Sequence, residues 1–116
     1  MDYSTLSDFE INCEVLAVFS PDINHMCLSG DNTCFYDCGP TGEGWNQINI
    51  PDYCNTPADA WPIIVDNLIS IDWHFNGSYK RVWGYSEKGL VELKCLQFDI
   101  LRAAMIVFLE MQENKQ

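Results

Sequence analysis

The chain contains 116 residues, with 17 Asp and Glu against six Lys and Arg, which gives a formal net charge of −11. Apolar residues make up 47% and aromatic residues 13%, so the chain is too apolar for a disordered acidic tail and is expected to fold as one domain over residues 1–116. The charge argues against non-specific binding to nucleic acid or to an anionic membrane, because too few cations are available to neutralise phosphates.

The negative charge is concentrated in the first two thirds of the chain. Residues 1–79 carry twelve acids and no Lys or Arg, whereas residues 80–116 carry all six basic residues and five acids. This distribution has two interpretations. It is either an acidic surface that keeps the protein soluble or one that attracts a basic partner.

No segment for targeting or for crossing a membrane is expected. The N-terminal residues lack the positive and apolar regions of a secretory signal, and the longest apolar-rich run, residues 100–111, is too short to cross a bilayer. We therefore predict a cytoplasmic protein. In that compartment the six cysteines are expected to be thiols.

The first predicted element is a helix over residues 8–19. Ser7 and Glu10 can exchange the two hydrogen bonds of a capping box at its start, and apolar residues then recur at helical spacing. The following residues lack that periodicity and contain turn-forming sequences. They predict a small antiparallel meander with strands near residues 26–28, 33–36 and 45–50.

A second helix is predicted from Pro57 to about Asn67. Thr56 is in position to cap it, and Pro57 suits the first helical position. Pro62 should bend the helix, because proline removes one internal hydrogen bond. Residues 60–65 are expected to supply a buried face.

A β-hairpin follows, in which apolar residues alternate over 69–75 and Asn76-Gly77 forms a two-residue turn. This turn would place Asp72 opposite Arg81, where the two side chains could form a cross-strand ion pair. A third strand is predicted near residues 90–95.

The last helix is predicted from Ile100 to about Gln112, with Asp99 as its cap. It is apolar nearly all round, and such a helix is either sandwiched in the core or covered by another subunit. The second alternative predicts a homo-oligomer and makes Ile106 and Glu110 candidate contact residues. The order of all elements, α-β-β-β-α-β-β-(β)-α, predicts an α+β fold in which a mostly antiparallel sheet packs between helices as an α/β/α sandwich.

Candidate metal ligands occur close together in the sequence, at His25, Cys27, Cys34 and Cys38. Zinc needs four converging ligands, usually from paired close spacings, and neither pair here is a CxxC knuckle. Small buried thiols are the simpler interpretation. We therefore expect no metal and no other cofactor. Because no catalytic motif is present either, the chain is not expected to be an enzyme, and a thiol- or zinc-dependent enzyme is a minor alternative.

Aromatic and basic residues lie close together in the hairpin, where Trp73, Tyr79, Arg81 and Trp83 are candidate interaction residues. Such a set could form a stacking platform for single-stranded nucleic acid. It could equally form a protein-binding patch, because Trp, Tyr and Arg dominate the hot spots of protein interfaces. Core packing is the simpler explanation for most of them.

Three segments of the chain together resemble a known family. They are LSDFEIN at residues 6–12, NIPDYCNTPADAWPIIVDNLISI at residues 49–71 and LRAAMIVFLEM at residues 101–111. In this order they resemble the phage ABA sandwich domain family, in particular the NinX-like small proteins of lambdoid phages and prophages. The resemblance implies a sheet with helices on both faces and one such domain over the chain, and it implies no catalytic residues.

These observations predict a small, non-enzymatic phage or prophage accessory protein that binds a protein in the bacterial cytoplasm. The partner would be a host factor or a component of host defence. The alternative is an acidic DNA mimic, in which residues 1–79 occupy the nucleic-acid site of a host protein. Direct contact with nucleic acid or with a membrane is not expected.

Overall fold

The computed structural model describes residues 2–37 and 46–115, apart from the side chain of Phe75. The elements are η1 (Tyr3–Thr5), α1 (Asp8–Phe19), η2 (Pro21–His25), β1 (Cys27–Leu28), β2 (Cys34–Tyr36), β3 (Gln47–Asn49), α2 (Pro57–Asp66), β4 (Ser70–Asn76), β5 (Tyr79–Ser86), β6 (Gly89–Leu96), η3 (Gln97–Asp99) and α3 (Ile100–Glu113). The predicted α+β class and the predicted order of elements are confirmed.

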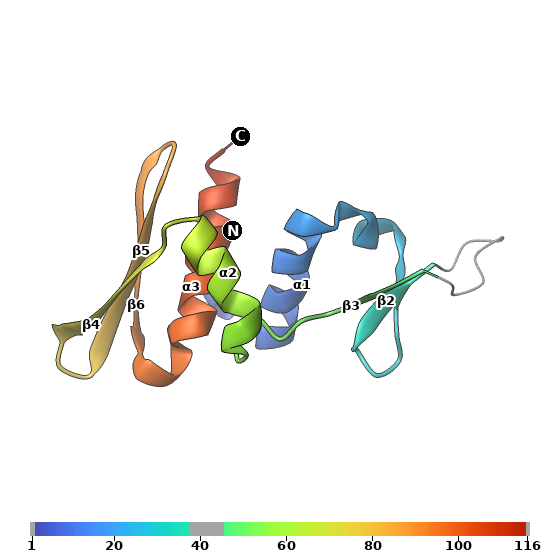
Figure 1. Ribbon diagram of the computed structural model, residues 1–116, viewed down its shortest axis with the longest axis horizontal. Helices are drawn as coiled ribbons and strands as arrows, with labels where there is room; N and C mark the ends of the chain where they lie inside the picture. Colours follow the sequence, from blue (N-terminus) through green and yellow to red (C-terminus); the bar gives the residue numbers. More distant parts are fainter. Residues whose placement is uncertain (1, 38–45, 116) are drawn as a thin grey trace.

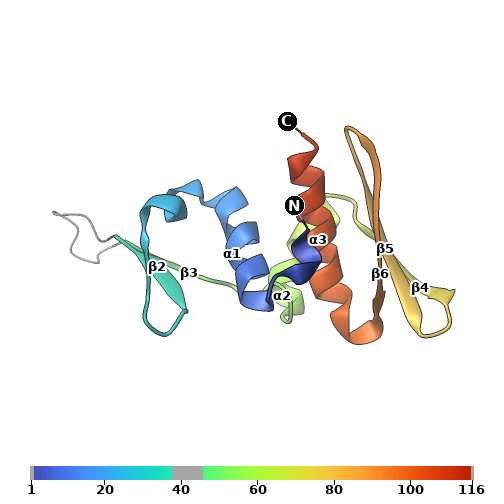
Figure 2. The same cartoon turned by 180° about the vertical axis from the view of Figure 1, so that it is seen from behind.

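The strands of the described residues form two separate antiparallel sheets. β1, β2 and β3 make a small sheet, and β4, β5 and β6 make a larger one, each in that order. The helices lie between the two sheets, with α3 against the larger sheet and α1 toward the small one (Figure 1 and Figure 2). The prediction placed one sheet between helices. In the structure the strands are divided between two sheets, because α1 separates the short strands from the larger sheet.

The predicted start of α1 is confirmed. The amide of Glu10 donates to Ser7 Oγ at 3.1 Å, and the amide of Ser7 donates to Glu10 Oε1 at 3.1 Å. Thr56 and Asp99 also occupy the predicted N-cap positions of α2 and α3, but neither side chain makes a cap hydrogen bond. Asp99 is the last residue of η3 and has φ −103° and ψ 13°, whereas a capping residue normally has an extended backbone.

The β4–β5 hairpin turns one residue later than predicted. Asn76 pairs with Tyr79, so the turn consists of residues 77–78, and the φ of 56° at the first of them suits glycine. A register shift between Asp72 and Asn76 then returns Asp72 to the position opposite Arg81. The predicted cross-strand position of this pair is therefore confirmed, although by a different turn.

The core is centred on α3, which is buried along most of its length. Its buried residues are Ile100, Ala103, Ala104, Met105, Ile106, Val107, Phe108, Leu109 and Met111. A Cβ on Gly84 of β5 would lie 2.7 Å from Met111 Sδ, so the helix approaches the sheet closely there. On the other side, the Phe108 ring stacks parallel to that of Phe19, with centroids 5.7 Å apart.

This packing explains why α3 is apolar on all sides. The larger sheet covers one side, and α1 and α2 contact others, so the helix is sandwiched within the chain itself. Of the two predicted alternatives, burial in the core is the one that the structure shows. Along the described part of the chain, α3 included, no helix combines the length and the apolar character needed to span a membrane.

Candidate interaction surfaces

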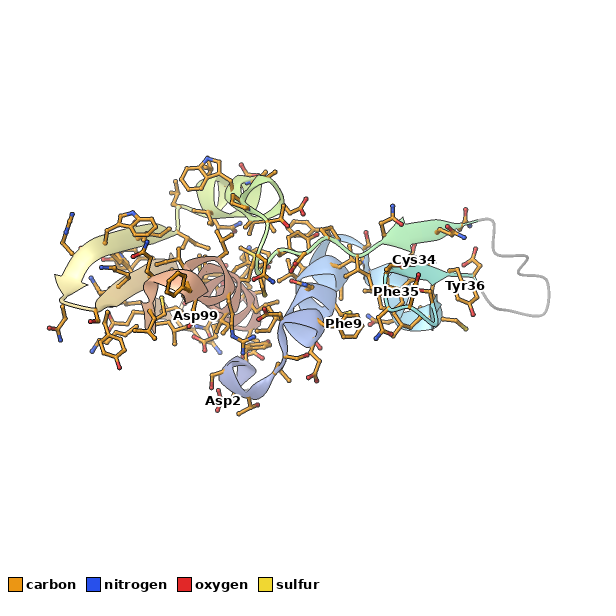
Figure 3. The ribbon with its side chains drawn as sticks, turned by 90° about the horizontal axis from the view of Figure 1, so that it is seen from below. Asp2, Phe9, Cys34, Phe35, Tyr36 and Asp99 are labelled. Atoms are coloured by element: carbon orange, nitrogen blue, oxygen red, sulfur yellow. The ribbon has the colours of Figure 1, made fainter. Side chains whose placement is uncertain are left out.

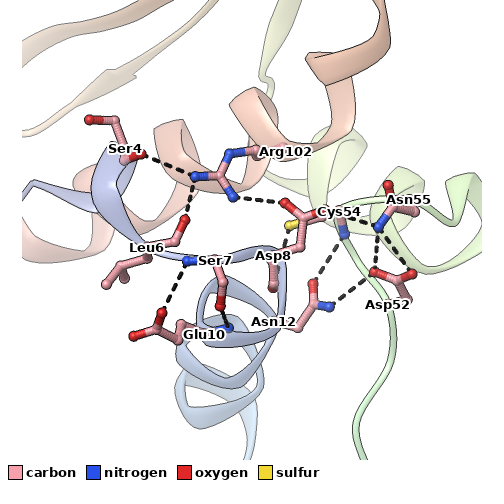
Figure 4. Close-up of polar contacts among 10 residues, drawn as sticks. All are labelled: Ser4, Leu6, Ser7, Asp8, Glu10, Asn12, Asp52, Cys54, Asn55 and Arg102. Carbon is pink, nitrogen blue, oxygen red and sulfur yellow. Dashed lines mark hydrogen bonds and ion pairs between the residues drawn. The ribbon is translucent and has the colours of Figure 1, made fainter.

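The three segments that carry the family resemblance meet at one polar junction between α1, α3 and the segment before α2 (Figure 4). The guanidinium of Arg102 on α3 donates to Asp8 Oδ1 at 2.7 Å and to the backbone carbonyls of Ser4 and Leu6 at 3.2 and 2.5 Å. Asp8 Oδ2 also accepts from Asn55 Nδ2 at 3.2 Å. These bonds hold the N-terminal segment against α3.

The junction continues from Asn55 toward the inside of the molecule. Asn55 Nδ2 donates to both carboxylate oxygens of Asp52, and Asp52 Oδ1 also accepts from Asn12 Nδ2 at 3.0 Å. Asn12 Oδ1 accepts from the amide of Cys54 at 3.1 Å, which explains how a buried asparagine is tolerated on α1. Throughout the described residues, every buried side-chain nitrogen or oxygen has a partner. The hydrogen bonds of the junction therefore have a structural role: they join α1, α3 and the segment before α2.

The thiol of Cys54 lies in the same junction, 3.8 Å from the backbone carbonyl oxygen of Asp8. Burial, and then the Asp8 carboxylate, raises the pKa of this thiol to about 12. Burial also raises the pKa of the Cys13 and Cys95 thiols. Thiols that remain protonated near neutral pH are poor nucleophiles and poor metal ligands.

The candidate zinc ligands His25, Cys27 and Cys34 lie on η2, β1 and β2. In the view from below, Cys34 lies on the small sheet, and Asp99 lies on the other side of α1 (Figure 3). Cys27 is disulfide-bonded, so the expectation that all six cysteines are thiols is wrong for this residue. That expectation came from the predicted cellular compartment, which does not say which sulfur atoms a fold brings together. Cys38 lies outside the described residues. Within the ranges 2–37 and 46–115, no three His, Cys, Asp or Glu side chains are grouped as metal ligands.

The larger sheet presents one face to α3 and a second face away from it, which we call the outer face. Val82 and Gly84 are buried against α3, and side chains that alternate with them point the other way. Paired across β5 and β6, the residues of the outer face are Tyr79 with Leu96, Arg81 with Lys94, Trp83 with Glu92, and Tyr85 with Leu90. The exposed fractions are 51% for Tyr79, 73% for Tyr85 and 45–47% for the two leucines.

Arg81 occupies the middle of the outer face. Its guanidinium carbon lies 4.3 Å from the ring centroid of Trp83, a cation–π arrangement. The predicted ion pair with Asp72 is wrong, because Arg81 Nε instead pairs with Glu92 Oε2 at 2.5 Å, while Asp72 Oδ1 accepts from the amide of His74. The Arg81 guanidinium thus contacts both the Glu92 carboxylate and the Trp83 ring.

The structure therefore separates the predicted interaction residues. Tyr79, Arg81 and Trp83 lie together on the outer face, as neighbours on alternate positions of β5. Ile106 is only 3% exposed, so its prediction as a contact residue is wrong, because α3 uses that side for its own core. Burial within the chain therefore explains the apolar character of α3 without a second subunit.

Trp73 lines a groove of about 400 Å³ between α2, β4 and the start of α3, which we call the aromatic groove. Trp61 of α2 and Phe98 of η3 line it as well, and the exposed fractions of Trp61, Trp73 and Phe98 are 57%, 48% and 93%. The other lining residues are Cys54, Asn55, Pro57, Ile71, Gln97, Ile100 and Leu101.

Sequence reasoning missed Trp61 because residues 60–65 were expected to form one buried face. That expectation holds for Ala60, Ile63 and Ile64 only, since Trp61 is exposed together with Val65. The signal that could have found it is a second apolar stripe on the same short helix, beyond the one that the core needs.

Glu110 lies half-buried near the end of α3, where burial and then the Glu113 carboxylate raise its pKa. A carboxyl whose pKa is higher in the folded than in the unfolded protein opposes folding while it is ionised, and this effect disappears as the pH falls through the folded-state pKa. We therefore expect Glu110→Gln to increase the free energy of unfolding near pH 7 by about 0.5 kcal/mol or less. Urea titrations near pH 7 and pH 4 should show the gain only at the higher pH.

Glu113→Gln is the matched control for this change. Tyr3 Oη donates to Glu113 Oε1 at 2.6 Å, so removing that carboxylate weakens a bond that joins the two ends of the chain. We expect this variant to be less stable than the wild type near pH 7. A destabilised Glu110→Gln protein at that pH would show that the Glu110 carboxylate makes favourable contacts instead.

Comparison with known proteins gives one family and one solved structure. The family model described as "Bacteriophage P22, NinX" matches residues 2–112. The crystal structure of a phage protein from Bacillus cereus ATCC 14579 is similar in fold, with a TM-score of 0.59 and 12% sequence identity over 94% of this chain and 90% of that one. The comparison with curated proteins finds no match. The chain belongs to the bacteriophage P22 NinX family.

Proposed function

We propose that this phage protein acts without chemistry of its own, by binding a host protein through the outer face of the larger sheet. The observation that carries the proposal is the Arg81–Trp83 stack, with a ring-to-guanidinium distance of 4.3 Å, among exposed tyrosines and leucines. Trp, Tyr and Arg supply most hot spots of protein interfaces, and a side chain that is already held in place loses little entropy on binding.

The charge on the outer face also supports the proposal. Arg81 and Lys94 carry two positive charges, and Glu92 and Asp72, which lies opposite Arg81 on β4, carry two negative ones, so the outer face is neutral, whereas the whole chain carries −11. A partner that approaches this face therefore avoids most of the repulsion or attraction that the rest of the molecule exerts. We place the encounter in the bacterial cytoplasm, with a host factor or a defence component as the partner.

Affinity capture from lysates of bacteria expressing the protein, followed by mass spectrometry, tests the proposal. The variant Trp83→Ala/Tyr85→Ala truncates the centre and one end of the outer face. Leu68→Asn is the matched control, because it removes a side chain that is 82% exposed between α2 and β4, at a φ of 54° that suits asparagine. We expect a specific host protein to bind the wild type and the control, and to bind the outer-face variant at least tenfold more weakly.

Two outcomes would contradict the proposal. The first is capture of no specific partner, and the second is a partner that binds the outer-face variant as well as the wild type. A partner that binds the outer-face variant as well as the wild type but is lost at high salt would favour the acidic DNA mimic instead, because salt screens binding that depends on charge.

A further inference from the structure

We propose that the aromatic groove is a second binding site, which takes an extended basic peptide segment with apolar anchor residues. This proposal goes beyond the binding of a partner by the outer face and rests on different residues. Trp73 lies on β4, whereas the centre of the outer face lies on β5, so substitutions in one surface leave the other intact.

The shape of the groove suits apolar anchors. Three aromatic side chains from three different elements line one concavity of about 400 Å³, a volume within the usual range for ligand sites. Ile100 and Cys54, both buried, add apolar surface to it. The Phe98 side chain is 93% exposed, and an exposed aromatic side chain beside two other exposed aromatic side chains is typical of an interaction site.

The charge around the groove indicates a basic occupant. The segments that line it, residues 54–61, 71–73 and 97–101, contain no Lys or Arg, and Asp59 and Asp99 lie next to lining residues in the sequence. Asp72 does not contribute, because it lies opposite Arg81 on the outer face. The carboxylates of Asp8 and Asp52 add to this charge at the Asn55 end, although Asp8 also pairs with Arg102. A basic segment would be attracted to this region, whereas a second copy of this chain, itself at −11, would be repelled.

An extended peptide can use both the apolar shape of the groove and the negative charge around it. In an extended chain, alternate side chains point to the same side, so apolar residues can enter the groove while lysines lie along its rim. The long lysine side chain can also pack its methylene groups on an indole and place its ammonium near the ring face. Trp61 and Trp73 both offer partly exposed rings for such contacts.

Titration of the ¹⁵N-labelled full chain with a synthetic peptide tests the proposal. The probe is Lys-Lys-Leu-Ser-Leu-Ser-Leu-Lys-Lys, blocked at both ends. Two control peptides replace either every Lys with Glu or every Leu with Ser. The indole N–H signals of Trp61, Trp73 and Trp83 report separately on the groove and on the outer face, once each signal has been assigned by substitution.

We expect the basic peptide to shift the indole signals of Trp61 and Trp73 and to leave that of Trp83 in place. Both control peptides should bind at least tenfold more weakly. Trp61→Ala and Phe98→Ser should each weaken binding at least tenfold. Because both side chains are exposed, we expect both variants to fold, so misfolding would not account for the lost affinity. Tyr85→Ala, on the outer face, should leave the affinity unchanged.

The proposal is overturned if about 1 mM of the basic peptide shifts neither groove indole. It is also overturned if the Glu-containing peptide binds equally well, or if the Trp83 signal moves as far as those of Trp61 and Trp73. These readouts differ from the lysate capture, so the groove and the outer face succeed or fail independently.

Discussion

Replacing Ile106 with aspartate is expected to leave the protein unfolded. Ile106 is 3% exposed at the centre of the buried length of α3. A carboxylate at this position would lose most of its hydration, which costs several kcal/mol, a large part of the roughly 5–15 kcal/mol that stabilises a typical domain. Far-ultraviolet circular dichroism and urea titration of the purified variant measure the effect.

Two further variants make this result interpretable. Ile106→Ala keeps the site apolar and is expected to fold with about 2–4 kcal/mol less stability, because it leaves a cavity. Tyr85→Asp places the same new charge on a residue that is 73% exposed and should change stability by about 0.5 kcal/mol or less. A folded Ile106→Asp protein with an altered oligomeric state in sedimentation would show that this side of α3 is a subunit interface instead.

Arg102→Met is expected to destabilise the protein by about 2 kcal/mol. The substitution keeps an unbranched apolar side chain but removes the donors that reach Asp8 and the carbonyls of Ser4 and Leu6. These acceptors belong to residues more than ninety positions away in the sequence, so the start of the chain loses its main polar attachment to α3. Urea unfolding measures the change, and hydrogen exchange should show faster exchange in η1.

Arg81→Met is the matched control for Arg102→Met. The side chains of Arg81 and Arg102 are 24% and 21% exposed, and their carboxylate partners are 40% and 44% exposed, so the two ion pairs are screened to a similar degree. The Arg102 guanidinium additionally satisfies two backbone carbonyls. Arg81→Met removes an ion pair and the contact with the Trp83 ring, and should therefore cost about 1 kcal/mol or less. Equal losses for the two variants would mean that the two carbonyl bonds of Arg102 contribute no more than the single contact of Arg81 with Trp83.

Local signals predicted those parts of the fold that depend on neighbours in the sequence. The capping box of Ser7 and Glu10 needs only four consecutive residues, and it is present in the structure. Thr56 and Asp99 stand at the predicted N-cap positions, but residue type does not say whether a side chain reaches the first helical amides, and neither of these side chains does so. The hairpin between β4 and β5 is present as predicted, but its turn lies one residue later, since the register shift in β4 has no counterpart in a two-residue turn rule.

The candidate surfaces were predictable in part. The sequence brought Tyr79, Arg81 and Trp83 together because alternate residues of one strand share a face. It gave no means of seeing that Glu92, from the next strand, would replace Asp72 as the partner of Arg81. The aromatic groove was missed because its walls come from α2, β4 and η3, which are separated in the chain.

The sequence by itself determined the α+β class, the order of the elements, the confinement of basic residues to positions 80–116 and the phage family. The tertiary structure alone decided that the strands form two sheets and that α3 is covered from within the chain. The physical reason is that periodicity shows how apolar each side of an element is, but not what covers it. Coverage is decided by long-range packing, and that packing buries Ile106 while it leaves Trp61 and Phe98 exposed.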